Sequence, residues 1–447
     1  MKKTPTVKEF TPRVLSTALP KHVGKTVKIY GWLHKKRELG GMTFLVIRDR
    51  GGLVQVVDEQ SEEAEKLKGL YAGTILLVEG DVVEEKRVEL GVEIRKPKVT
   101  VVVPVEYVSP VEIDKPIDHK PENLESLFDN KIVNMRNVTE QGIWKVQAGV
   151  GEAIREFLKA NDFTEFHSPK ILAQATEGGA EVFKLDYFGK SAFLAQSPQF
   201  YKQIMVGSLE RVYEFGAAYR AEPSSTTRHM TEYLSIDFEM GFINAFQDVL
   251  TLLGELIYFT CERVWETHEK ELSLLKAEKP ILKKELPQIT MKDLHELYLK
   301  EKGEDFRKEK DPTPSEERFI CEYSAKHWGS EAVYITEFPA SHMKFYHFRS
   351  ETNPEVTERA DLIFRGVEII TTSRREHRYA NIVKQLVDFG GDLEDPGYQY
   401  FLQAFKYGMP SHGGGGLGLE RLTQKLIGLN NVKEATLFPR DLNRLAP

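Results

Sequence analysis

Residues 219–240 read YRAEPSSTTRHMTEYLSIDFEM, a polar loop between two segments that have the alternating pattern of strands. Arg220 ends the first segment, Arg228 and His229 stand in the loop, and Asp237 lies in the second segment. Because arginine grips phosphate oxygens through charge-assisted hydrogen bonds, a hairpin with these charges favours a triphosphate as its ligand. A solvated hairpin with incidental charges is the competing interpretation of this stretch alone.

A second string, HGGGGLGLER at residues 412–421, contains glycines at the spacing of the dinucleotide fingerprint G-x-G-x-x-G. That fingerprint opens a βαβ unit, and only 29 residues follow Gly418, so a dinucleotide fold is excluded. Bare glycine backbone admits a flat ligand, and Arg421 on a following helix can reach back over it, which indicates a nucleotide site. A glycine turn that lets a strand approach a helix closely is the structural alternative.

Composition narrows the class of protein. The chain has 447 residues, 41% hydrophobic and 29% charged, which is enough for two or three domains with a sizeable core. Its apolar runs are far shorter than the ~20 residues of a bilayer span, and the N-terminus lacks a signal peptide pattern, so we expect a cytoplasmic protein without membrane contact. Two cysteines sixty positions apart, Cys261 and Cys321, exclude a disulfide scaffold and a cysteine zinc site.

The net charge of -7 hides a split along the chain. Residues 1–110 carry 19 Lys and Arg against 15 Asp and Glu, a net of +4, and the remainder carries 42 against 53, a net of -11. The N-terminal excess is a weak indication of a polyanionic partner.

The coarse pattern of elements predicts the domain organisation. Short strands at residues 27–32, 43–47, 53–57, 74–79 and 99–103, with a helix at 61–70, suit a five-stranded Greek-key barrel of the OB type. We expect an OB domain at 1–105, a proline-containing linker at 106–135, and a large domain at 136–447 with a charged insertion around 270–330. Within the large domain we expect a strand at 211–220, helices at 244–265 and 376–387, and one strand at 360–372.

Three strings together resemble the class II aminoacyl-tRNA synthetases. Arg220-Ala-Glu222 with Thr227-Arg228-His229 resembles their motif 2, residues 416–421 resemble motif 3, and residues 157–171 resemble motif 1, whose proline, here Pro169, lies at a dimer interface. An N-terminal OB barrel is typical of subclass b, which comprises the aspartyl, asparaginyl and lysyl enzymes. The resemblance implies an α+β fold: an antiparallel catalytic sheet flanked by helices, preceded by the all-β barrel, in a homodimer that binds tRNA.

Within that subclass, QSPQFYKQ at residues 196–203 is similar to the aspartyl enzymes of archaeal and eukaryotic type. The resemblance implies an L-aspartate site in which Lys202 and Arg375 hold the side-chain carboxylate and Glu177 meets the ammonium group. Gln199, Arg220 and Asp237 complete the site. Two cations on one carboxylate would both be left unpaired by asparagine, so aspartate is expected to be preferred.

The resemblance also implies ATP as substrate and Mg²⁺ as cofactor. Arg220 would bind the α-phosphate and the α-carboxylate of aspartate, and Glu222 the adenine amino group. Arg228 and His229 would hold the outer phosphates, Arg421 would stack on adenine, and Gly418 would line the nucleotide. Glu368 and Thr371 fall where the family holds magnesium, a hard ion that prefers oxygen ligands. Catalysis would then depend on charge stabilisation by Arg220, Arg421 and Glu368, without a side-chain nucleophile.

In the barrel, Phe44 and Gln55 match positions that read the central anticodon uridine in the subclass, and Arg37 lies on the same surface. Phe44 alone would more often be a core residue. Position 34 tends to be histidine in relatives that charge both tRNA(Asp) and tRNA(Asn), and His34 therefore favours the wider range of substrates.

One departure from the family leaves alternatives open. Residues 370–374 read Ile-Thr-Thr-Ser-Arg where aspartyl enzymes usually read Ser-Ser-Gly-Gly-Gln, which adds bulk beside the amino-acid site. An asparaginyl ligase is therefore a rival of the same class. A synthetase-like protein that no longer aminoacylates is a rival of another class, although Arg220, Glu222, Glu368 and Arg421 are all present.

Overall fold

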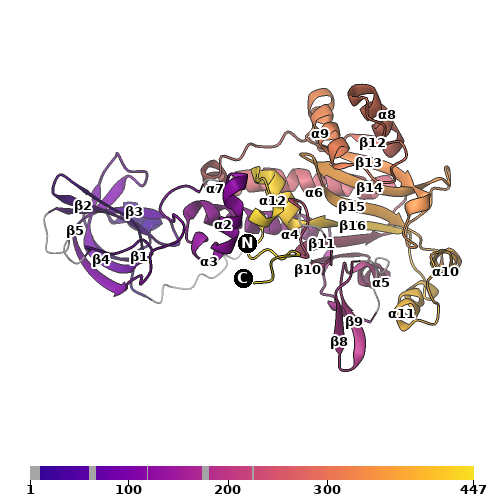
Figure 1. Ribbon diagram of the computed structural model, residues 1–447, viewed down its shortest axis with the longest axis horizontal. Helices are drawn as coiled ribbons and strands as arrows, with labels where there is room; N and C mark the ends of the chain where they lie inside the picture. The colour runs from indigo at the N-terminus through magenta and orange to yellow at the C-terminus, as the bar shows by residue number, and fades with distance from the viewer. Residues whose placement is uncertain (1–10, 60–66, 118, 174–180, 224–225, 447) are drawn as a thin grey trace. The chain divides into compact units, whose positions relative to one another are not determined.

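The computed structural model describes residues 11–59, 67–117, 119–173, 181–223 and 226–446 (Figure 1). The chain forms two compact units. The first contains residues 1–118 and 130–141, and the second contains residues 119–129 and 142–447. No helix in the described part of the chain is long and apolar enough to cross a membrane.

The first unit is a closed five-stranded barrel of OB type, which confirms the predicted fold. After the 3₁₀ helix η1 (Ser16–His22) come β1 (Thr26–Leu39), β2 (Met42–Arg48), β3 (Leu53–Glu59), β4 (Ile75–Glu84) and β5 (Val92–Val103), in the order β1-β2-β3-β5-β4. Alternate residues such as Val27, Ile29, Leu45 and Ile47 fill its core. The predicted helix at 61–70 falls mostly outside the described residues.

An eight-stranded sheet forms the centre of the second unit. Its order is β12 (Gln288–Thr290), β13 (Ala332–Pro339), β14 (Val356–Phe364), β15 (Val367–Arg375), β16 (His412–Gly418), β11 (Glu232–Gly241), β10 (Arg211–Tyr219) and β6 (Thr164–Glu165). Neighbouring strands are antiparallel except for the pairs β12–β13 and β6–β10. The predicted antiparallel sheet of the catalytic domain is therefore confirmed.

Two long helices share the main core with this sheet (Figure 1). α4 (Val138–Ala160) contributes Val150 and Ile154, and α6 (Phe246–Thr267) contributes Leu253 and Ile257. α12 (Leu419–Ile427) follows β16 directly and buries Leu422 and Leu426 against the same core. The apolar stripe of each helix therefore faces the sheet, as helical periodicity requires.

A second group of three helices forms its own apolar cluster. α5 (Gln199–Leu209), α10 (Tyr379–Asp388) and α11 (Pro396–Lys406) pack together in an aromatic cluster around Phe200 and Phe401. β7 (Ile171–Leu172), β8 (Lys184–Tyr187) and β9 (Lys190–Leu194) form a small separate sheet.

The charged insertion is built into the edge of the large sheet. After α7 (Glu269–Leu274), the segment adds β12, α8 (Met291–Lys302) and α9 (Pro314–Trp328). These elements share a core with β13 that includes Leu294, Ile320 and Ile335. Because α9 starts beside this edge, side chains of its first turn can reach over one face of the sheet.

One expectation about local structure needs correction. The single strand expected at 360–372 is wrong, since β14 and β15 form a hairpin there. Its turn has Arg365 and Gly366 at φ 46° and 78°, a left-handed pair typical of tight hairpins. The segment expected as a linker at 106–135 contains η2 (Pro121–Asn123), α2 (Leu124–Asp129) and α3 (Lys131–Asn134).

Candidate active site

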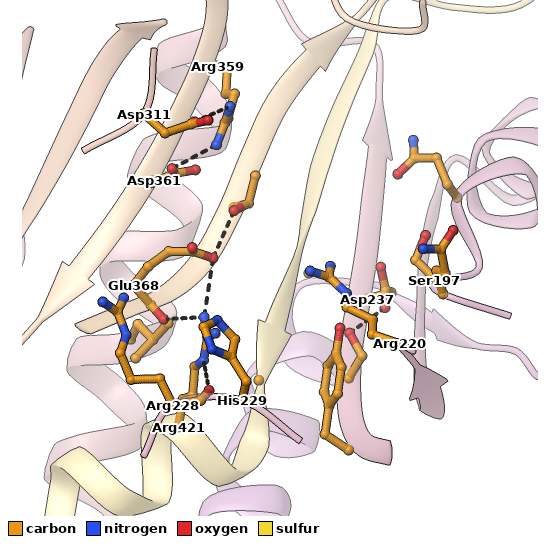
Figure 2. Close-up of a pocket in the computed structure, with 18 of the residues that line it drawn as sticks. Ser197, Arg220, Arg228, His229, Asp237, Asp311, Arg359, Asp361, Glu368 and Arg421 are labelled. Atoms are coloured by element: carbon orange, nitrogen blue, oxygen red, sulfur yellow. Dashed lines mark hydrogen bonds and ion pairs between the residues drawn. The ribbon is translucent and has the colours of Figure 1, made fainter. Parts of the chain in front are cut away.

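A cavity of about 450 Å³ lies over β11, β14, β15 and β16 (Figure 2). All the residues expected in the large domain that the structure describes line it: Gln199, Lys202, Arg220, Glu222, Arg228, His229, Asp237, Glu368, Thr371, Arg375, Gly418 and Arg421. Glu177 lies outside the described residues. We call the part lined by Gln199, Lys202, Asp237 and Arg375 the inner end, and the part lined by Arg220, Glu222, Arg228, His229, Glu368 and Arg421 the outer end.

Lys202 lies at the inner end with only 2% of its side chain exposed. It comes from α5, where Gln199, Lys202 and Gln203 share one buried helix face. Its ammonium group donates to Asp237 Oδ1 at 2.8 Å and to the Gly415 carbonyl oxygen at 3.0 Å. The second carboxylate oxygen of Asp237 accepts a hydrogen bond from the Ser235 hydroxyl at 2.6 Å.

Arg375, at the end of β15, is held just as closely. Its Nε and Nη2 donate to the two carboxylate oxygens of Glu239 at 2.9 and 3.3 Å. Nη2 also donates to the Gly414 carbonyl oxygen at 3.0 Å, and Nη1 donates to the Ser373 hydroxyl at 2.7 Å. Ser373, one of the residues that depart from the family pattern, therefore helps to orient the arginine.

These contacts bear on one expectation about specificity. We expected asparagine to leave Lys202 and Arg375 unpaired, but each already has a buried carboxylate partner in the protein, Asp237 and Glu239 respectively. The four charges sum to zero before any amino acid binds. In this structure neither Lys202 nor Arg375 is therefore a bare cation.

The glycine run of β16 has two different roles. Gly413, Gly414 and Gly415 do not line the cavity, whereas Gly416 and Gly418 do. A Cβ atom on Gly414 would overlap the Phe238 carbonyl oxygen, and one on Gly415 would lie 2.5 Å from the Thr371 carbonyl oxygen. The close approach to a ligand that the sequence predicted thus concerns only the end of the run, and the start of the run serves strand packing.

The outer end is more open. Arg220 follows β10 directly, and 46% of its side chain is exposed, with the guanidinium group 3.9 Å from Glu222. Burial raises the pKa of Glu222. His229 Nδ1 and Thr226 Oγ1 share a hydrogen bond at 2.8 Å. Burial, together with Arg421, Arg228 and Arg220, lowers the pKa of His229 to about 4, so its imidazole is neutral at pH 7.

Two further arginines lie near Glu368 (Figure 2). Arg421 contacts Glu368 directly, and Arg228 is linked to it through Glu317. Arg421 Nη1 donates to the Glu368 carbonyl oxygen at 3.0 Å, and its Nε donates to the Arg228 carbonyl oxygen at 3.3 Å. Arg228 Nη2 donates to Glu317 Oε2 at 2.5 Å, and the same carboxylate oxygen accepts from the Glu368 backbone N–H at 3.2 Å. Glu317 lies in the first turn of α9, so the insertion supplies a wall of this site.

Glu368 and Asp361 form an acidic pair over β14 and β15. The Thr371 hydroxyl donates to Glu368 Oε1 at 2.9 Å. Burial alone would raise the pKa of Glu368, but Arg421, the Thr371 hydroxyl and Arg359 together lower it. Burial raises the pKa of Asp361, and its Oδ1 is buried without a hydrogen-bond partner among the described residues. Two adjacent carboxylates, one with an unused oxygen, suit a hard cation.

Several residues of the site had no role assigned from the sequence, and three of them matter for its geometry. Glu239 lies two positions after Asp237 on the same strand face, so the period of two in β11 was a usable signal. Asp361 pairs with Thr371 across β14 and β15, a register that the single predicted strand obscured. Glu317 reaches the cavity from α9, fifty residues before the start of β15, and no local pattern indicates it.

The expected anticodon residues lie on the barrel. Arg37 pairs with Phe44 across β1 and β2, and Val46, on the same face as Phe44, pairs with Gln55. Phe44 is half-buried and Arg37 is exposed, so these side chains are on the outer face. His34 differs, because it sits at a bulge in β1, is only 9% exposed, and has its pKa lowered by burial.

Family models agree with both units. Residues 123–442 match the model of the class II tRNA synthetases (D, K and N), and residues 27–103 match the OB-fold nucleic acid binding domain. The first match covers well over half of the chain.

Full-length relatives carry names in the same group. The aspartate–tRNA(Asp/Asn) ligase of Deinococcus radiodurans is 39% identical over 97% of this chain and 99% of the relative. The aspartate–tRNA(Asp) ligase of Pyrococcus abyssi is 39% identical over 95% of this chain and 97% of the relative. The crystal structure of asparaginyl-tRNA synthetase from Pyrococcus horikoshii, complexed with asparaginyl-adenylate, superposes with a TM-score of 0.89 at 30% identity over 97% of this chain and 99% of that one. The chain is therefore a member of the class II tRNA synthetases of the D, K and N group.

Proposed function

We propose that the protein ligates L-aspartate to tRNA(Asp), and also to tRNA(Asn), through an aspartyl-adenylate. The observation that carries this proposal is that Lys202 and Arg375 end the same cavity whose other end gathers Arg220, Arg228 and Arg421. An acidic amino acid at the inner end would lie directly beside a nucleotide at the outer end. The names of the relatives support both the amino acid and the two tRNAs.

In the first step, the α-carboxylate of aspartate attacks the α-phosphorus of ATP, and pyrophosphate leaves with the electrons of the broken P–O bond. Arg220 neutralises the charge that builds up on the α-phosphate, and Glu222 accepts a hydrogen bond from the adenine amino group. Arg228 holds the outer phosphates, and His229, neutral in the free enzyme, donates a hydrogen bond to them. Positioning and charge stabilisation account for the rate, without a side-chain nucleophile.

Glu368 and Thr371 would hold Mg²⁺, and Asp361 adds an oxygen that already lacks a partner. Magnesium is commonly bound by one or two carboxylates together with substrate phosphates, and this set of donors fits that pattern. The ion supplies charge neutralisation on the phosphates. Arg421 donates to the Glu368 backbone and so keeps this strand end in place beside the adenine.

In the second step, the terminal ribose hydroxyl of the tRNA attacks the aspartyl carbonyl carbon and releases AMP. The outer face of the barrel, with Arg37, Phe44 and Gln55, would bind the anticodon through charge and base stacking. We also propose a cytoplasmic homodimer with Pro169 at its interface. Sedimentation of the purified protein tests the dimer, and a monomer at working concentration would refute it.

The test of function is ATP–pyrophosphate exchange with aspartate and asparagine in parallel, followed by charging of the two purified tRNAs. We expect exchange with aspartate only and charging of both tRNAs. Two observations support the alternative of an asparaginyl-tRNA synthetase. The inner end is charge-neutral, and the crystal structure of an asparaginyl-tRNA synthetase superposes on the chain. Exchange with asparagine alone would establish it, and no exchange with either amino acid would favour a synthetase-like protein without ligase activity.

A further inference from the structure

The loop that carries Arg228 and His229 is held by a segment near the C-terminus. We call residues 432–441 the C-terminal brace; the segment begins with η4 (Val432–Ala435). The Val432 backbone N–H donates to the Thr227 carbonyl oxygen at 3.0 Å, and the Thr231 backbone N–H donates to the Arg440 carbonyl oxygen at 2.9 Å. The two ends of the brace therefore bond the two ends of residues 227–231.

The contacts continue between those two points. The Thr436 hydroxyl donates to the Met230 sulfur at 2.8 Å. Arg421 Nε donates to the Arg228 carbonyl oxygen at 3.3 Å, and the Arg220 backbone N–H donates to the Thr231 carbonyl oxygen at 2.9 Å. Residues 227–230 lie beyond the paired part of β10 and β11, so ladder bonds do not determine their path. The brace supplies bonds that a sheet would otherwise provide.

The brace is itself tied together by a buried ion pair. Lys433 Nζ and Asp441 pair within it, and each side chain is only 6% exposed. Gln147 Nε2, from α4, donates to the Ala435 carbonyl oxygen at 2.8 Å. Because the ion pair joins the first turn of the brace to its last residue, it sets the separation of the two backbone bonds to the loop.

We propose that the C-terminal brace is a positioning device for the phosphate-binding loop, with the Lys433–Asp441 pair as its clasp. Of the brace, only Val432 lines the cavity, and the brace places no charged side chain there. It acts by keeping Arg228 and His229 directed into the outer end of the cavity, where the outer phosphates of ATP bind. Loss of the clasp therefore weakens ATP binding and leaves aspartate binding unchanged. This inference rests on the proposed function.

The experiment measures KM for ATP and KM for aspartate by pyrophosphate exchange in the full-length enzyme. For Asp441→Asn we expect KM for ATP to rise about tenfold and KM for aspartate to stay within about twofold. The charge-reversed double variant Lys433→Asp with Asp441→Lys re-forms the pair and is expected to recover most of the ATP affinity. Equal changes in both KM values, or no change in either, would overturn the inference.

Arg444→Gln is the matched control. It removes surface ion pairs with Asp129 and Glu125 just beyond the brace, and its side chain does not touch the loop, so both KM values should be unchanged. If Asp441→Asn does not fold, Thr436→Val removes the hydroxyl contacts with the Met230 sulfur and with the Val432 carbonyl oxygen inside the brace. We expect a two- to threefold rise in KM for ATP alone; an unchanged value would count against the brace. Absent exchange in the unaltered enzyme would instead refute the proposed function.

Discussion

The two ends of the cavity expose positive charge to different degrees. At the inner end, Lys202 and Arg375 are 2% and 4% exposed, and each is paired with a buried carboxylate. At the outer end, Arg220 is 46% exposed and lies 3.9 Å from Glu222, whereas Arg228 is 18% exposed and is paired with Glu317. An incoming phosphate can add to the exposed Arg220, whereas a carboxylate at the inner end must share or exchange existing bonds. The outer end is therefore built for charge stabilisation and the inner end for geometric selection.

The largest effect should come from the outer end. For Arg220→Ala we expect the rate of aspartyl-adenylate formation to fall about 10²- to 10³-fold, because the charge on the α-phosphate loses its donor. Thermal unfolding should hardly change, since the side chain is half exposed. Single-turnover adenylate formation is the measurement. Nearly normal rates in this variant would show that charge stabilisation at the outer end does not depend on Arg220.

At the inner end, Lys202→Leu should damage both specificity and stability. Asp237 would be left buried without its partner, which costs about 3 kcal/mol in the free energy of unfolding, and KM for aspartate should rise about 100-fold. KM for ATP should change little. The double variant Lys202→Leu with Asp237→Leu is the control, and it should recover stability without recovering aspartate use. Equal losses in ATP and aspartate binding would argue against a specific role for Lys202.

The two ends also differ in how a histidine makes the free energy of unfolding depend on pH. His412 and His229 both have a lowered pKa, but they differ in burial. His412 lies beside the inner end, is fully buried, and has its pKa lowered from 6.5 to about 4 chiefly by burial. Its Nδ1 donates to the Pro410 carbonyl oxygen, and its Nε2 accepts from Gln203. The unfolded chain therefore binds more protons between pH 6.5 and 4. Stability is complete above pH 6.5 and falls as the pH decreases through that window.

Between pH 8 and 5 this one group should remove about 2 kcal/mol of unfolding free energy. Urea unfolding at the two pH values measures the loss, and His412→Gln should lose about that much less. His229 has its pKa lowered to about 4 as well, but 35% of its side chain is exposed, so His229→Gln should alter the pH dependence less. If His229→Gln altered the pH dependence of unfolding more than His412→Gln does, the proposed difference between the two ends would be wrong.

The smallest effect concerns the link between the insertion and the outer end. Glu317 neutralises Arg228 in the free enzyme, so Glu317→Gln should strengthen the attraction of Arg228 for phosphate and lower KM for ATP about threefold. Glu316→Gln is the matched control on the same helix turn, because Glu316 bonds His295 and Thr313 and does not line the cavity. A rise in KM for ATP would mean that Glu317 mainly orients Arg228.

The sequence predicted the parts of the site whose residues lie next to each other in the chain. Arg220 with Glu222, and Gly418 with Arg421, sit in short strings whose chemistry is visible locally, and the barrel followed from strand alternation. The pairing of Arg375 with Glu239 could not be predicted, because it depends on β15 and β11 both flanking β16. The position of Glu317 depends on the packing of α9 against the sheet edge. One local feature was also missed: the hairpin turn at Arg365 and Gly366, which separates β14 from β15.

The glycine run of β16 has a consequence for how this protein can evolve. Every missense change in a glycine codon introduces a side chain, and at Gly414 any such atom would collide with the Phe238 backbone. At Gly418 the nearest atoms to an added Cβ are 3.7 Å away and belong to the flexible side chain of Arg421. Glycines that look equivalent in the sequence should therefore differ widely in a saturation mutagenesis screen, with residues 413–415 nearly invariant and Gly418 more permissive for folding.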